Sequence, residues 1–328
     1  MHLQDSSGRS FHYLRLSVTD LCNFRCTYCL PEGYQRGLRS DPDMSPVEIE
    51  RLVAAFSSMG FWKFRLTGGE PTTRSDIVEI AERVSRVAGV KRLAISTNGY
   101  RLKALVRPLL GAGVTAFNVS LDSLDREKFN RTTGTSKFED VMSGIEEVLA
   151  AGTASIKLNA VLMRDVNDRP EDVHRFAEFV RERPISIRWI ELMRTGENSE
   201  LFQKHHVSAT SLQRTFLESG WLRVARQSGD GPAVEFTHPS YRGRLGLIAP
   251  YGQGFCETCN RLRVSSAGGL RLCLFGSGEI PLREFLQSDG QKDQLVAAVH
   301  AALRMKLPTH LLHEGNYGIT RNLSTIGG

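Results

Sequence analysis

The sequence has no long apolar run, no internal repeat and no low-complexity segment. Hydrophobic residues make up 41% of its 328 residues, but no stretch approaches the ~18 apolar residues of a membrane helix. The segment 1–13 lacks the apolar core of a secretory signal peptide. We therefore expect a globular protein with an ordinary core, no membrane partner and a cytoplasmic location.

Cysteine is scarce, since the chain has only six. They form two groups of three with none left over: Cys22, Cys26 and Cys29, and Cys256, Cys259 and Cys273. In a reducing cytosol such cysteines are more often metal ligands than disulfide partners. The sequence therefore predicts two metal-binding regions.

Blocks of like charge are also absent, although the net charge is +6. A basic chain suits a polyanionic ligand, either a nucleotide or a nucleic acid. Because Lys and Arg are spread along the chain, a nucleic-acid surface is the weaker interpretation. A modestly basic enzyme with no anionic ligand is the plain alternative.

The first cysteine group has the spacing C-x3-C-x2-C and follows an apolar strand predicted over Leu14–Val18. Three thiolates on one loop can bind three irons of a [4Fe–4S] cluster, which leaves the fourth iron open to a ligand outside the protein. Half of a zinc site, or three unrelated buried thiols, are the alternatives. A structural zinc site needs four ligands, and no further Cys or His follows Cys29 closely. The loop resembles that of the radical S-adenosylmethionine (SAM) enzymes, where SAM occupies the open iron.

Strands and helices alternate through the first 190 or so residues. The predicted strands are 14–18, 62–67, 92–96, 116–121, 156–162 and 185–191. Each but the last is followed by a helix, the first beginning at the capping box Ser45-Pro46-Val47-Glu48. This alternation predicts a parallel sheet with right-handed crossovers. Six units can curve into an open, TIM-like (βα)6 barrel; a flat doubly wound sheet fits the same pattern.

From about Thr195 the pattern changes to a helix near 211–218, short β segments with turn residues between them, and an amphipathic helix over 294–306. We therefore expect an α/β chain with two parts. Residues 1–194 form the partial barrel, and residues 195–328 form a smaller α+β region that carries the second cysteine group.

Polar residues lie on the predicted inward faces of the strands. Period-two alternation groups Arg65 with Thr67, Asn118 with Ser120 and Asp122, and Lys157 with Asn159. Parallel strands covered on both faces should be almost continuously apolar. The alternative for any single residue is a solvent-exposed position on a frayed strand. Together, however, these residues favour a polar barrel lumen that binds a charged ligand.

Gly68-Gly69-Glu70-Pro71 follows the second predicted strand. Paired glycines let the backbone approach a ligand closely or adopt a positive φ. A plain turn explains such a motif equally well when it stands alone. One helix and one strand after the cysteine loop, it is similar to the turn that holds the amino group of SAM in radical SAM enzymes.

The second cysteine group has the spacing C-x2-C-x13-C and contains the segment Asn260-Arg261-Leu262-Arg263. On a strand, Arg261 and Arg263 share one face, where their guanidinium groups suit phosphate oxygens. A zinc ribbon with a distant fourth ligand fits the spacing too, and His238 is the nearest preceding histidine.

Taken together, these motifs resemble the GTP 3′,8-cyclases of molybdenum cofactor biosynthesis, which are radical SAM enzymes with two [4Fe–4S] clusters. The resemblance covers nearly the whole chain. It rests on Arg15, the two cysteine groups, Gly68–Pro71, Ser120-Leu121-Asp122-Ser123, Glu191-Leu192-Met193, the Arg261–Arg263 segment and the terminal Gly327-Gly328.

The resemblance implies a role for each matching position. The first cysteine group would hold the SAM cluster and the second group a cluster that faces guanine. The SAM contacts would be Tyr28, Gly69, Ser120 and Met193. The GTP contacts would be Arg15, Arg65, Ser96, Lys157, Arg261, Leu262 through its backbone, and Arg263. The catalytic residues would be Arg15, Arg261, Arg263, Gly327 and Gly328. Ser96 stands where the family usually has threonine. Serine keeps the hydroxyl group of threonine and lacks only its methyl group.

The implied reaction is that of a lyase. An external electron donor reduces the first cluster, SAM splits, and the 5′-deoxyadenosyl radical removes hydrogen from C3′ of GTP. The ribose radical then attacks C8 of guanine, and reduction and protonation of the cyclised radical give (8S)-3′,8-cyclo-7,8-dihydroguanosine 5′-triphosphate. This product passes to cyclic pyranopterin monophosphate synthase. A homodimer is a further expectation; a nucleic-acid partner is not.

Two rival functions fit parts of the sequence. One is a peptide-modifying radical SAM enzyme with an auxiliary cluster, although such enzymes usually carry more than three C-terminal cysteines. The other is a zinc-containing nucleic-acid-binding protein that uses the second group and the basic charge. Iron and zinc contents distinguish the two classes.

Overall fold

The computed structural model describes residues 3–35, 41–227, 229–276, 278–321 and 323–324. One curved sheet dominates it, and in the described residues its strand order is β14-β13-β12-β3-β4-β5-β6-β7-β8-β11-β10-β9. The six predicted strands form its centre in chain order: β3 (Tyr13–Ser17), β4 (Lys63–Thr67), β5 (Arg92–Thr97), β6 (Ala116–Ser120), β7 (Ser155–Leu162) and β8 (Ser186–Glu191). All neighbouring pairs among them are parallel, so the prediction of a parallel α/β sheet is confirmed.

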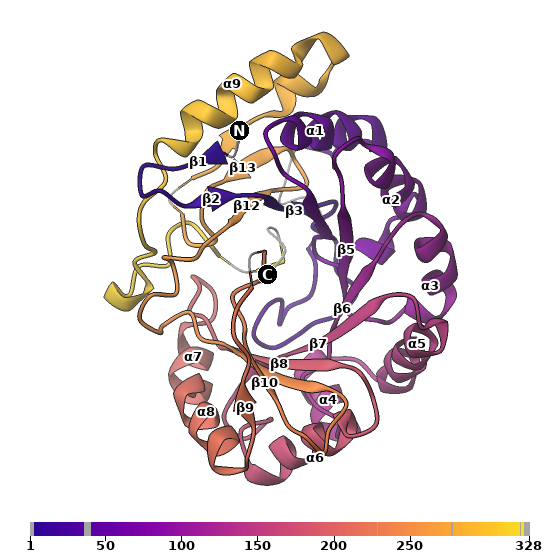
Figure 1. Ribbon diagram of the computed structural model, residues 1–328, viewed down its shortest axis with the longest axis vertical. Coiled ribbons are helices and arrows are strands. Elements are labelled where there is room, and N and C mark those ends of the chain that lie inside the picture. Colours follow the sequence, from indigo (N-terminus) through magenta and orange to yellow (C-terminus); the bar gives the residue numbers. More distant parts are fainter. Residues whose placement is uncertain (1–2, 36–40, 228, 277, 322, 325–328) are drawn as a thin grey trace.

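Helices cover the outer side of this sheet (Figure 1). They are α1 (Pro46–Ser58), α2 (Ile77–Arg86), α3 (Leu102–Gly111), α4 (Arg126–Thr133), α5 (Phe138–Ala151) and α6 (Pro170–Val180). Helix α1 begins with the predicted capping box, in which Ser45 accepts from the Glu48 backbone and the Glu48 carboxylate accepts from the Ser45 backbone. Side chains such as Phe64, Phe117 and Trp189 are completely buried in the core.

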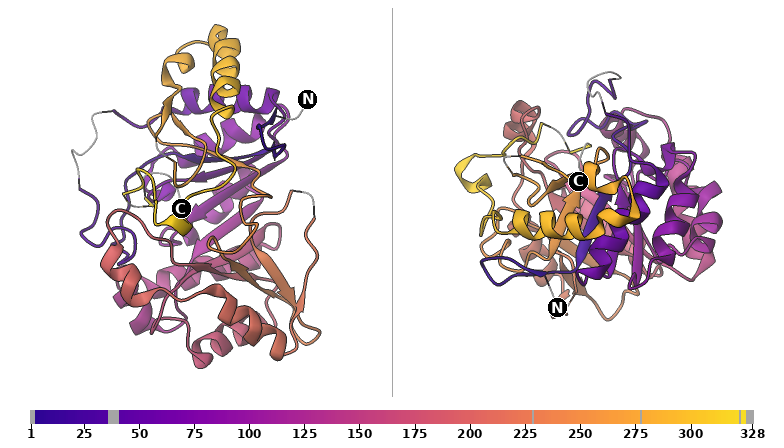
Figure 2. Two further views of the ribbon diagram at one scale, coloured as in Figure 1. Left: turned by 90° about the vertical axis from the view of Figure 1, so that its left-hand side faces the viewer. Right: turned by 90° about the horizontal axis from the view of Figure 1, so that it is seen from above.

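Two further strands extend the parallel sheet. Strand β12 (Arg261–Val264) pairs with β3, and β11 (Arg244–Ile248) pairs with β8, both in parallel. Antiparallel strands follow on each side: β13 (Gly269–Arg271) and β14 (Ile280–Pro281) beyond β12, and β10 (Val234–Thr237) and β9 (Leu222–Arg223) beyond β11. The sheet therefore curves into an open barrel whose flanks come from the second half of the chain (Figures 1 and 2).

The remaining elements lie around this sheet. A short hairpin, β1 (Leu3–Gln4) and β2 (Ser10–Phe11), precedes β3. The 3-10 turn η1 (Pro71–Thr73) follows β4 in the first half of the chain. Helices α7 (Ser199–His205), α8 (Ala209–Glu218) and α9 (Lys292–Leu303) belong to the second half, together with the 3-10 turns η2 (Arg283–Leu286), η3 (Asp289–Gln291) and η4 (Leu312–Glu314). No helix in the described part of the chain is long and apolar enough to cross a bilayer.

The inner face of the barrel is polar, as the strand alternation predicts. Along β3, Leu14 and Leu16 are fully buried in the core, whereas Tyr13 and Arg15 line an internal pocket. Arg65, Lys157 and Asn159 line the same pocket from β4 and β7. The barrel thus positions charged side chains from several strands around one cavity.

Candidate functional site

The first cysteine group lies at the carboxyl ends of the parallel strands. Cys22, Cys26 and Cys29 are half-buried on one loop and line a cavity that we call the cysteine-loop pocket. Thr67, Thr97 and Ser120, the last residues of β4, β5 and β6, line the same pocket. The carboxyl ends of barrel strands are where enzymes of this architecture place their active sites.

Backbone hydrogen bonds hold the Gly68-Gly69 turn against this loop. Gly69 N–H donates to the Thr19 carbonyl at 2.8 Å, and Glu70 N–H donates to the Leu21 carbonyl at 2.7 Å. A Cβ atom at Gly69 would lie 2.3 Å from the Leu21 oxygen, and one at Gly68, where φ is +149°, would lie 2.2 Å from the Thr19 oxygen. Only glycine permits this approach of the two backbones.

Two buried carboxylates organise the same pocket. Glu70 is 1% exposed and accepts hydrogen bonds from Thr72, Thr97 and the Asn98 backbone, which fastens the turn to β5. Asp122 accepts from the Tyr28 hydroxyl at 2.9 Å and from the Val161 backbone at 2.8 Å. Burial raises the pKa of Asp122 to about 6, against the opposing effect of these hydrogen bonds.

The three thiols fit the first cluster by placement and chemistry. Burial raises the pKa of Cys22 to about 11 and that of Cys29 to about 12, and it raises that of Cys26 as well. These groups are therefore neutral thiols without a metal, and iron would have to displace their protons. In the described residues no His, Cys, Asp or Glu side chains converge on a point for a single ion. Each thiolate of a four-iron cluster binds a different iron, so such convergence is not required.

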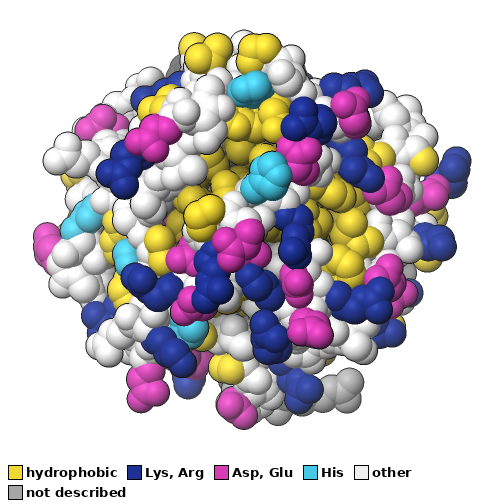
Figure 3. All heavy atoms as spheres, turned by 90° about the horizontal axis from the view of Figure 1, so that it is seen from below, with side chains coloured by type: hydrophobic (Ala, Val, Ile, Leu, Met, Phe, Trp, Pro, Cys, Tyr) yellow, Lys and Arg dark blue, Asp and Glu magenta, His cyan; other side chains and the backbone are white. Residues whose placement is uncertain are grey.

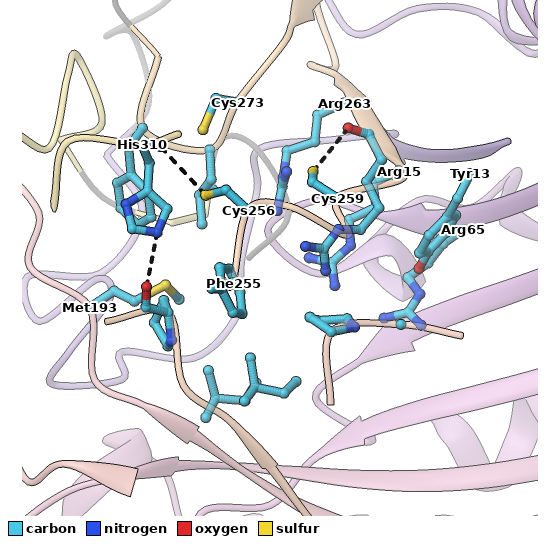
Figure 4. Close-up of a pocket in the computed structure, with 18 of the residues that line it drawn as sticks. Tyr13, Arg15, Arg65, Met193, Phe255, Cys256, Cys259, Arg263, Cys273 and His310 are labelled. Atoms are coloured by element: carbon cyan, nitrogen blue, oxygen red, sulfur yellow. Dashed lines mark hydrogen bonds between the residues drawn. The ribbon is translucent and has the colours of Figure 1, made fainter. Parts of the chain in front are cut away.

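A second cavity, the basic pocket, occupies the barrel interior beside the first (Figure 4). Seven basic side chains line it: Arg15, Lys63, Arg65, Lys157, Arg188, Arg261 and Arg263. No Asp or Glu is among the described residues that line it. Such a set favours a ligand with several negative charges.

Strand register assembles these cations. Tyr13, the first residue of β3, pairs with Arg261 on one side and Lys63 on the other, and two residues along Arg15 pairs with Arg263 and Arg65. Because side chains two residues apart share a face, both rows point into the barrel. In Figure 4, Arg15, Arg65 and Arg263 extend into the cavity from these strands.

Burial destabilises the charges of this set. It lowers the pKa of Lys63 and Lys157 to about 8, that of Arg15 to about 10 and that of Arg263 to about 9. The Nε atoms of Arg65, Arg188, Arg261 and Arg263 are buried without a hydrogen-bond partner in the described part of the chain. Buried polar groups are normally paired, so these donors are arranged for an external acceptor.

Tyr13 lies among these cations. Its side chain is buried, with Lys63 Nζ 4.7 Å and the Arg65 guanidinium 5.5 Å from its ring centre. Burial raises its pKa, but Arg65, Arg15 and Lys63 outweigh this effect and bring the pKa down to about 7. A phenolate at this position would partly neutralise the pocket.

The second cysteine group lines the basic pocket, since Cys256, Cys259 and Cys273 are all in its wall. His310 N–H donates to Cys256 Sγ at 3.5 Å, and Arg9 donates to the Cys256 carbonyl at 3.2 Å. Burial raises the pKa of Cys259, but Arg261, Lys306 and Arg263 more than offset it and lower the pKa to about 7. Cys259 therefore lies in a positive field that favours its thiolate form.

The two pockets share a wall. Asn159, Ile190 and Met193 line both of them. The first cysteine group thus lies on one side of this wall and the second on the other, with the cations on the side of the second.

The structure places the predicted residues as follows. Tyr28, Gly69, Ser120 and Met193 line the cysteine-loop pocket, and Arg15, Arg65, Lys157, Arg261 and Arg263 line the basic pocket. Ser96 lines the cysteine-loop pocket and accepts from Arg65 Nη1 at 3.4 Å. The Leu262 side chain points away into the core, where it is fully buried. Gly327 and Gly328 lie outside the described residues.

Sequence reasoning missed four polar residues of the basic pocket: Tyr13, Lys63, Arg188 and His310. Tyr13 and Lys63 are two residues before Arg15 and Arg65, so strand alternation predicts that each shares a face with its neighbour. Arg188 of β8 pairs with Asn159 of β7 in the sheet register, and it donates to Asn118 Oδ1 at 3.1 Å. His310, by contrast, follows the last long helix, and no pattern indicates its position.

The C-terminal segment crosses between the two sites. Gly318 approaches the backbone of Phe275 and Gly276, Thr320 Oγ1 donates to the Leu274 carbonyl, and Gly196 N–H donates to the Thr320 carbonyl. Leu323 and Ser324 line the cysteine-loop pocket, where their backbone N–H groups donate to the Cys29 thiol. The described part of the tail therefore extends from the second cysteine group to the first.

Comparisons with known proteins agree with this arrangement. Residues 16–180 match the Radical SAM superfamily, and residues 185–312 match the family Molybdenum Cofactor Synthesis C. SuiB of Streptococcus suis bound to S-adenosylmethionine has a TM-score of 0.66 at 14% identity, over 90% of this chain and 68% of SuiB. The protein anSMEcpe with bound AdoMet and Cp18Cys peptide has a TM-score of 0.50 at 17% identity, over 63% of this chain and 60% of its own.

At these identities the solved structures show a common fold. The sequence matches go further, because the first spans half of the chain and includes the cysteine loop and the glycine turn. The second match includes Arg261, Arg263 and all three cysteines of the second group. The chain therefore belongs to the radical SAM superfamily, and its two matched regions form the domain architecture of the GTP 3′,8-cyclases of molybdenum cofactor biosynthesis.

Proposed function

We propose that the protein is a GTP 3′,8-cyclase, a lyase that converts GTP into (8S)-3′,8-cyclo-7,8-dihydroguanosine 5′-triphosphate. The observation that carries this proposal is the basic pocket, where seven basic side chains and no described acid line the same cavity as the second cysteine group and adjoin the cavity of the first. A triphosphate carries about four negative charges, and fixed cations bind it with little reorganisation. The match to Molybdenum Cofactor Synthesis C supports the same pathway.

Each cysteine group would hold one [4Fe–4S] cluster in this proposal. Tyr28, Gly69, Ser120 and Met193 line the cavity where SAM would lie. A bound cluster and SAM would supply the 5′-deoxyadenosyl radical that the proposed hydrogen abstraction from C3′ of the ribose requires. The missing side chain at Gly69 lets this turn pack directly against the cysteine loop, at the edge of the same cavity.

The chain's own residues position the nucleotide. Arg15, Arg65 and Arg263 face one another across adjacent strands, so their guanidinium groups can bind separate phosphate oxygens. The Leu262 backbone lies between Arg261 and Arg263 and would contact the base, whereas its side chain anchors β12 in the core. Ser96 accepts from Arg65 and so orients it. Holding the ribose beside the wall shared by the two pockets converts a bimolecular hydrogen transfer into an intramolecular one.

Apolar side chains restrict water around the reacting centre. Ile190 and Met193 form part of the shared wall, and Phe255 and Phe275 line the basic pocket near the second cysteine group. The proposal further requires an external one-electron donor. Its product would be the substrate of cyclic pyranopterin monophosphate synthase.

The decisive experiment is an anaerobic assay with SAM, a strong reductant and GTP. We expect 5′-deoxyadenosine to form in an amount that depends on GTP, together with the cyclised triphosphate. Arg261→Ala and Arg263→Ala should lose GTP turnover by at least 10-fold and still cleave SAM, since both residues line the basic pocket. Normal GTP affinity in both variants would contradict the nucleotide assignment. Nucleotide-independent cleavage stimulated by a peptide would instead favour a peptide-modifying enzyme.

A further inference from the structure

A third cavity, the rim pocket, opens at the opposite end of the barrel from the cysteine loop. Arg92, Ser155 and Ser186, the first residues of β5, β7 and β8, line it. The cysteine-loop pocket is lined instead by the last residues of β4, β5 and β6. Strand β7 has eight residues, which corresponds to about 25 Å at a rise of ~3.3 Å per residue.

The rim pocket adjoins the basic pocket. Lys157, Arg188 and Gly231 line both cavities. The basic pocket in turn shares Asn159, Ile190 and Met193 with the cysteine-loop pocket. The three cavities therefore follow one another along the barrel, with the cations of the basic pocket in the middle.

The two end pockets have opposite charge. Six basic side chains line the rim pocket, namely Arg92, Lys157, Arg188, Arg226, Arg242 and Arg244, against two acidic ones, Asp230 and Glu235. Four of these arginines line the rim pocket alone: Arg92, Arg226, Arg242 and Arg244. Among the described residues, only Arg244 of these four has a carboxylate partner, Glu235 at 3.3 Å. The cysteine-loop pocket is lined by Glu70 and Asp122 and by no described Lys or Arg.

This polarity sorts the two small molecules of the proposed reaction by charge. A nucleoside triphosphate is strongly anionic and is attracted to the basic end, while the acidic end repels it. SAM carries a sulfonium cation and an ammonium group, which the acidic end attracts. Independently of charge, the tail residues Leu323 and Ser324 form part of the lining of the cysteine-loop pocket.

From this adjacency and polarity we infer that the rim pocket is an anion-binding vestibule through which the nucleoside triphosphate enters the barrel, whereas SAM reaches its site from the cysteine-loop end. This inference rests on the proposed function. In it, Arg92 and Arg242 attract the polyphosphate, and Lys157 and Arg188 at the junction pass it to Arg15 and Arg65. Product and substrate use the same opening, so its width limits both association and release.

Gly231 offers a direct test because it lies at the junction. A Cβ atom added there would meet no described heavy atom within 4 Å, and its φ is not in the left-handed region. A larger side chain can therefore extend into the passage without backbone strain. Gly231→Trp should narrow the passage, and Gly231→Ala is the matched control with a single added methyl group.

The measurement uses the anaerobic holoenzyme and radiolabelled GTP with rapid filtration. We expect Gly231→Trp to slow both association and dissociation of GTP by at least 10-fold and to change the equilibrium Kd by less than 3-fold. Gly231→Ala should resemble the unmodified enzyme, and SAM association should be unchanged in both. A subsite contact alone would change Kd through the dissociation rate, and that result would overturn the route.

Charge provides a second arm that does not depend on a bulky residue. Gly231→Glu and Gly231→Gln have nearly the same shape, and only the former should slow GTP association, by at least 10-fold at low salt. Arg92→Gln combined with Arg242→Gln should weaken the salt dependence of GTP association and leave that of SAM unchanged. If all these variants kept the unmodified rates for GTP, the route would be wrong and the proposed function would stand. If the unmodified holoenzyme bound no GTP, the proposed function itself would fail.

Discussion

At the scale of single residues, the basic pocket holds seven basic side chains, and no described Asp or Glu lines it to balance their charge. Lys63, Arg188, Arg261 and Arg263 are each less than 10% exposed, and burial lowers the pKa of the first two and of Arg263. Buried charges without partners are costly. Binding of a polyanion should therefore stabilise the folded protein and raise its Tm.

The pKa values of the pocket predict how substrate capture depends on pH. Tyr13 becomes a phenolate above about pH 7, and Lys63 and Lys157 lose their protons above about pH 8. Both changes remove net positive charge, so kcat/KM for GTP should fall from about pH 7 upward. In Tyr13→Phe the phenolate cannot form, and the fall should begin near pH 8 instead.

This prediction is checked by pH profiles of kcat/KM, which report the free enzyme. Tyr241→Phe is the matched control, because Tyr241 bonds to Glu178 and Arg181 and does not line the basic pocket. Identical profiles for Tyr13→Phe and the unmodified enzyme would show that Tyr13 does not affect the charge of the pocket.

Arg188 and Gly246 form a pair across neighbouring strands. Gly246 is opposite Arg188 in the register of β11 and β8, and a Cβ atom there would lie 2.8 Å from Arg188 Cγ. We expect Arg188→Gln to weaken GTP binding by at least 10-fold, or about 1.4 kcal/mol. Gly246→Ala should act in the same direction, because it displaces the arginine side chain.

Equilibrium binding of GTP measures both effects, and SAM binding serves as the internal reference. Arg107→Gln is a surface control, since Arg107 pairs only with Glu147 among the described residues and is 76% exposed. Unchanged GTP affinity in Arg188→Gln would remove this residue from the binding set.

At the scale of elements, the glycine turn joins two segments that are far apart in the sequence. Gly69→Ala would place a methyl group 2.3 Å from the Leu21 carbonyl oxygen, so the cysteine loop or the turn must move. We expect a loss of about 2 kcal/mol or more in the free energy of unfolding and loss of SAM cleavage. Denaturant unfolding and the formation of 5′-deoxyadenosine check the two parts.

Gly111→Ala is the matched control for this substitution. Gly111 is the last residue of α3, and a Cβ atom there would meet no described heavy atom within 4 Å. Because alanine favours helix over glycine, this variant should be neutral or more stable by about 0.5–1 kcal/mol. Equal unfolding energies for the two variants would mean that the turn tolerates a side chain after all.

The central elements could be predicted from the sequence because local rules decide them. The apolar strands and the capping box at Ser45 correspond to observed elements. Short β segments are predicted after Thr195, and Arg261 and Arg263 are considered on a strand, but the pairing of β11 and β12 as parallel flanks of the barrel is not predicted. Pairing between distant segments depends on tertiary contacts that no local pattern records. Helix α7, with seven residues and no buried one, has no apolar stripe to reveal it.

At the scale of the whole molecule, the site was predicted where chemistry demands rare residues at fixed spacing. The cysteine groups, the glycine turn and the Arg261–Arg263 segment are such signals, and they line two adjoining pockets. The order of the three adjoining cavities and the opposite charge of the two end pockets could not be predicted. Both depend on how eight parallel strands curve together.

Metal content tests the proposed pair of clusters. After anaerobic reconstitution we expect about eight irons with matching sulfide per chain. Replacing Cys256, Cys259 and Cys273 by serine should leave about four irons and retain SAM cleavage. Iron, sulfide and zinc analyses check this, and tightly bound zinc without iron would contradict both cluster assignments.

The pairing of β12 with β3 has a consequence for how the protein is made. Strand β3 is complete at Ser17, but its neighbour begins only at Arg261. At roughly 5–20 residues per second, a ribosome needs about 12–50 s to synthesise the intervening segment. During that time the nascent barrel exposes one flank of β3, an unpaired strand edge of the kind that promotes aggregation. Newborn chains should therefore depend on chaperones until the last quarter of the polypeptide has emerged.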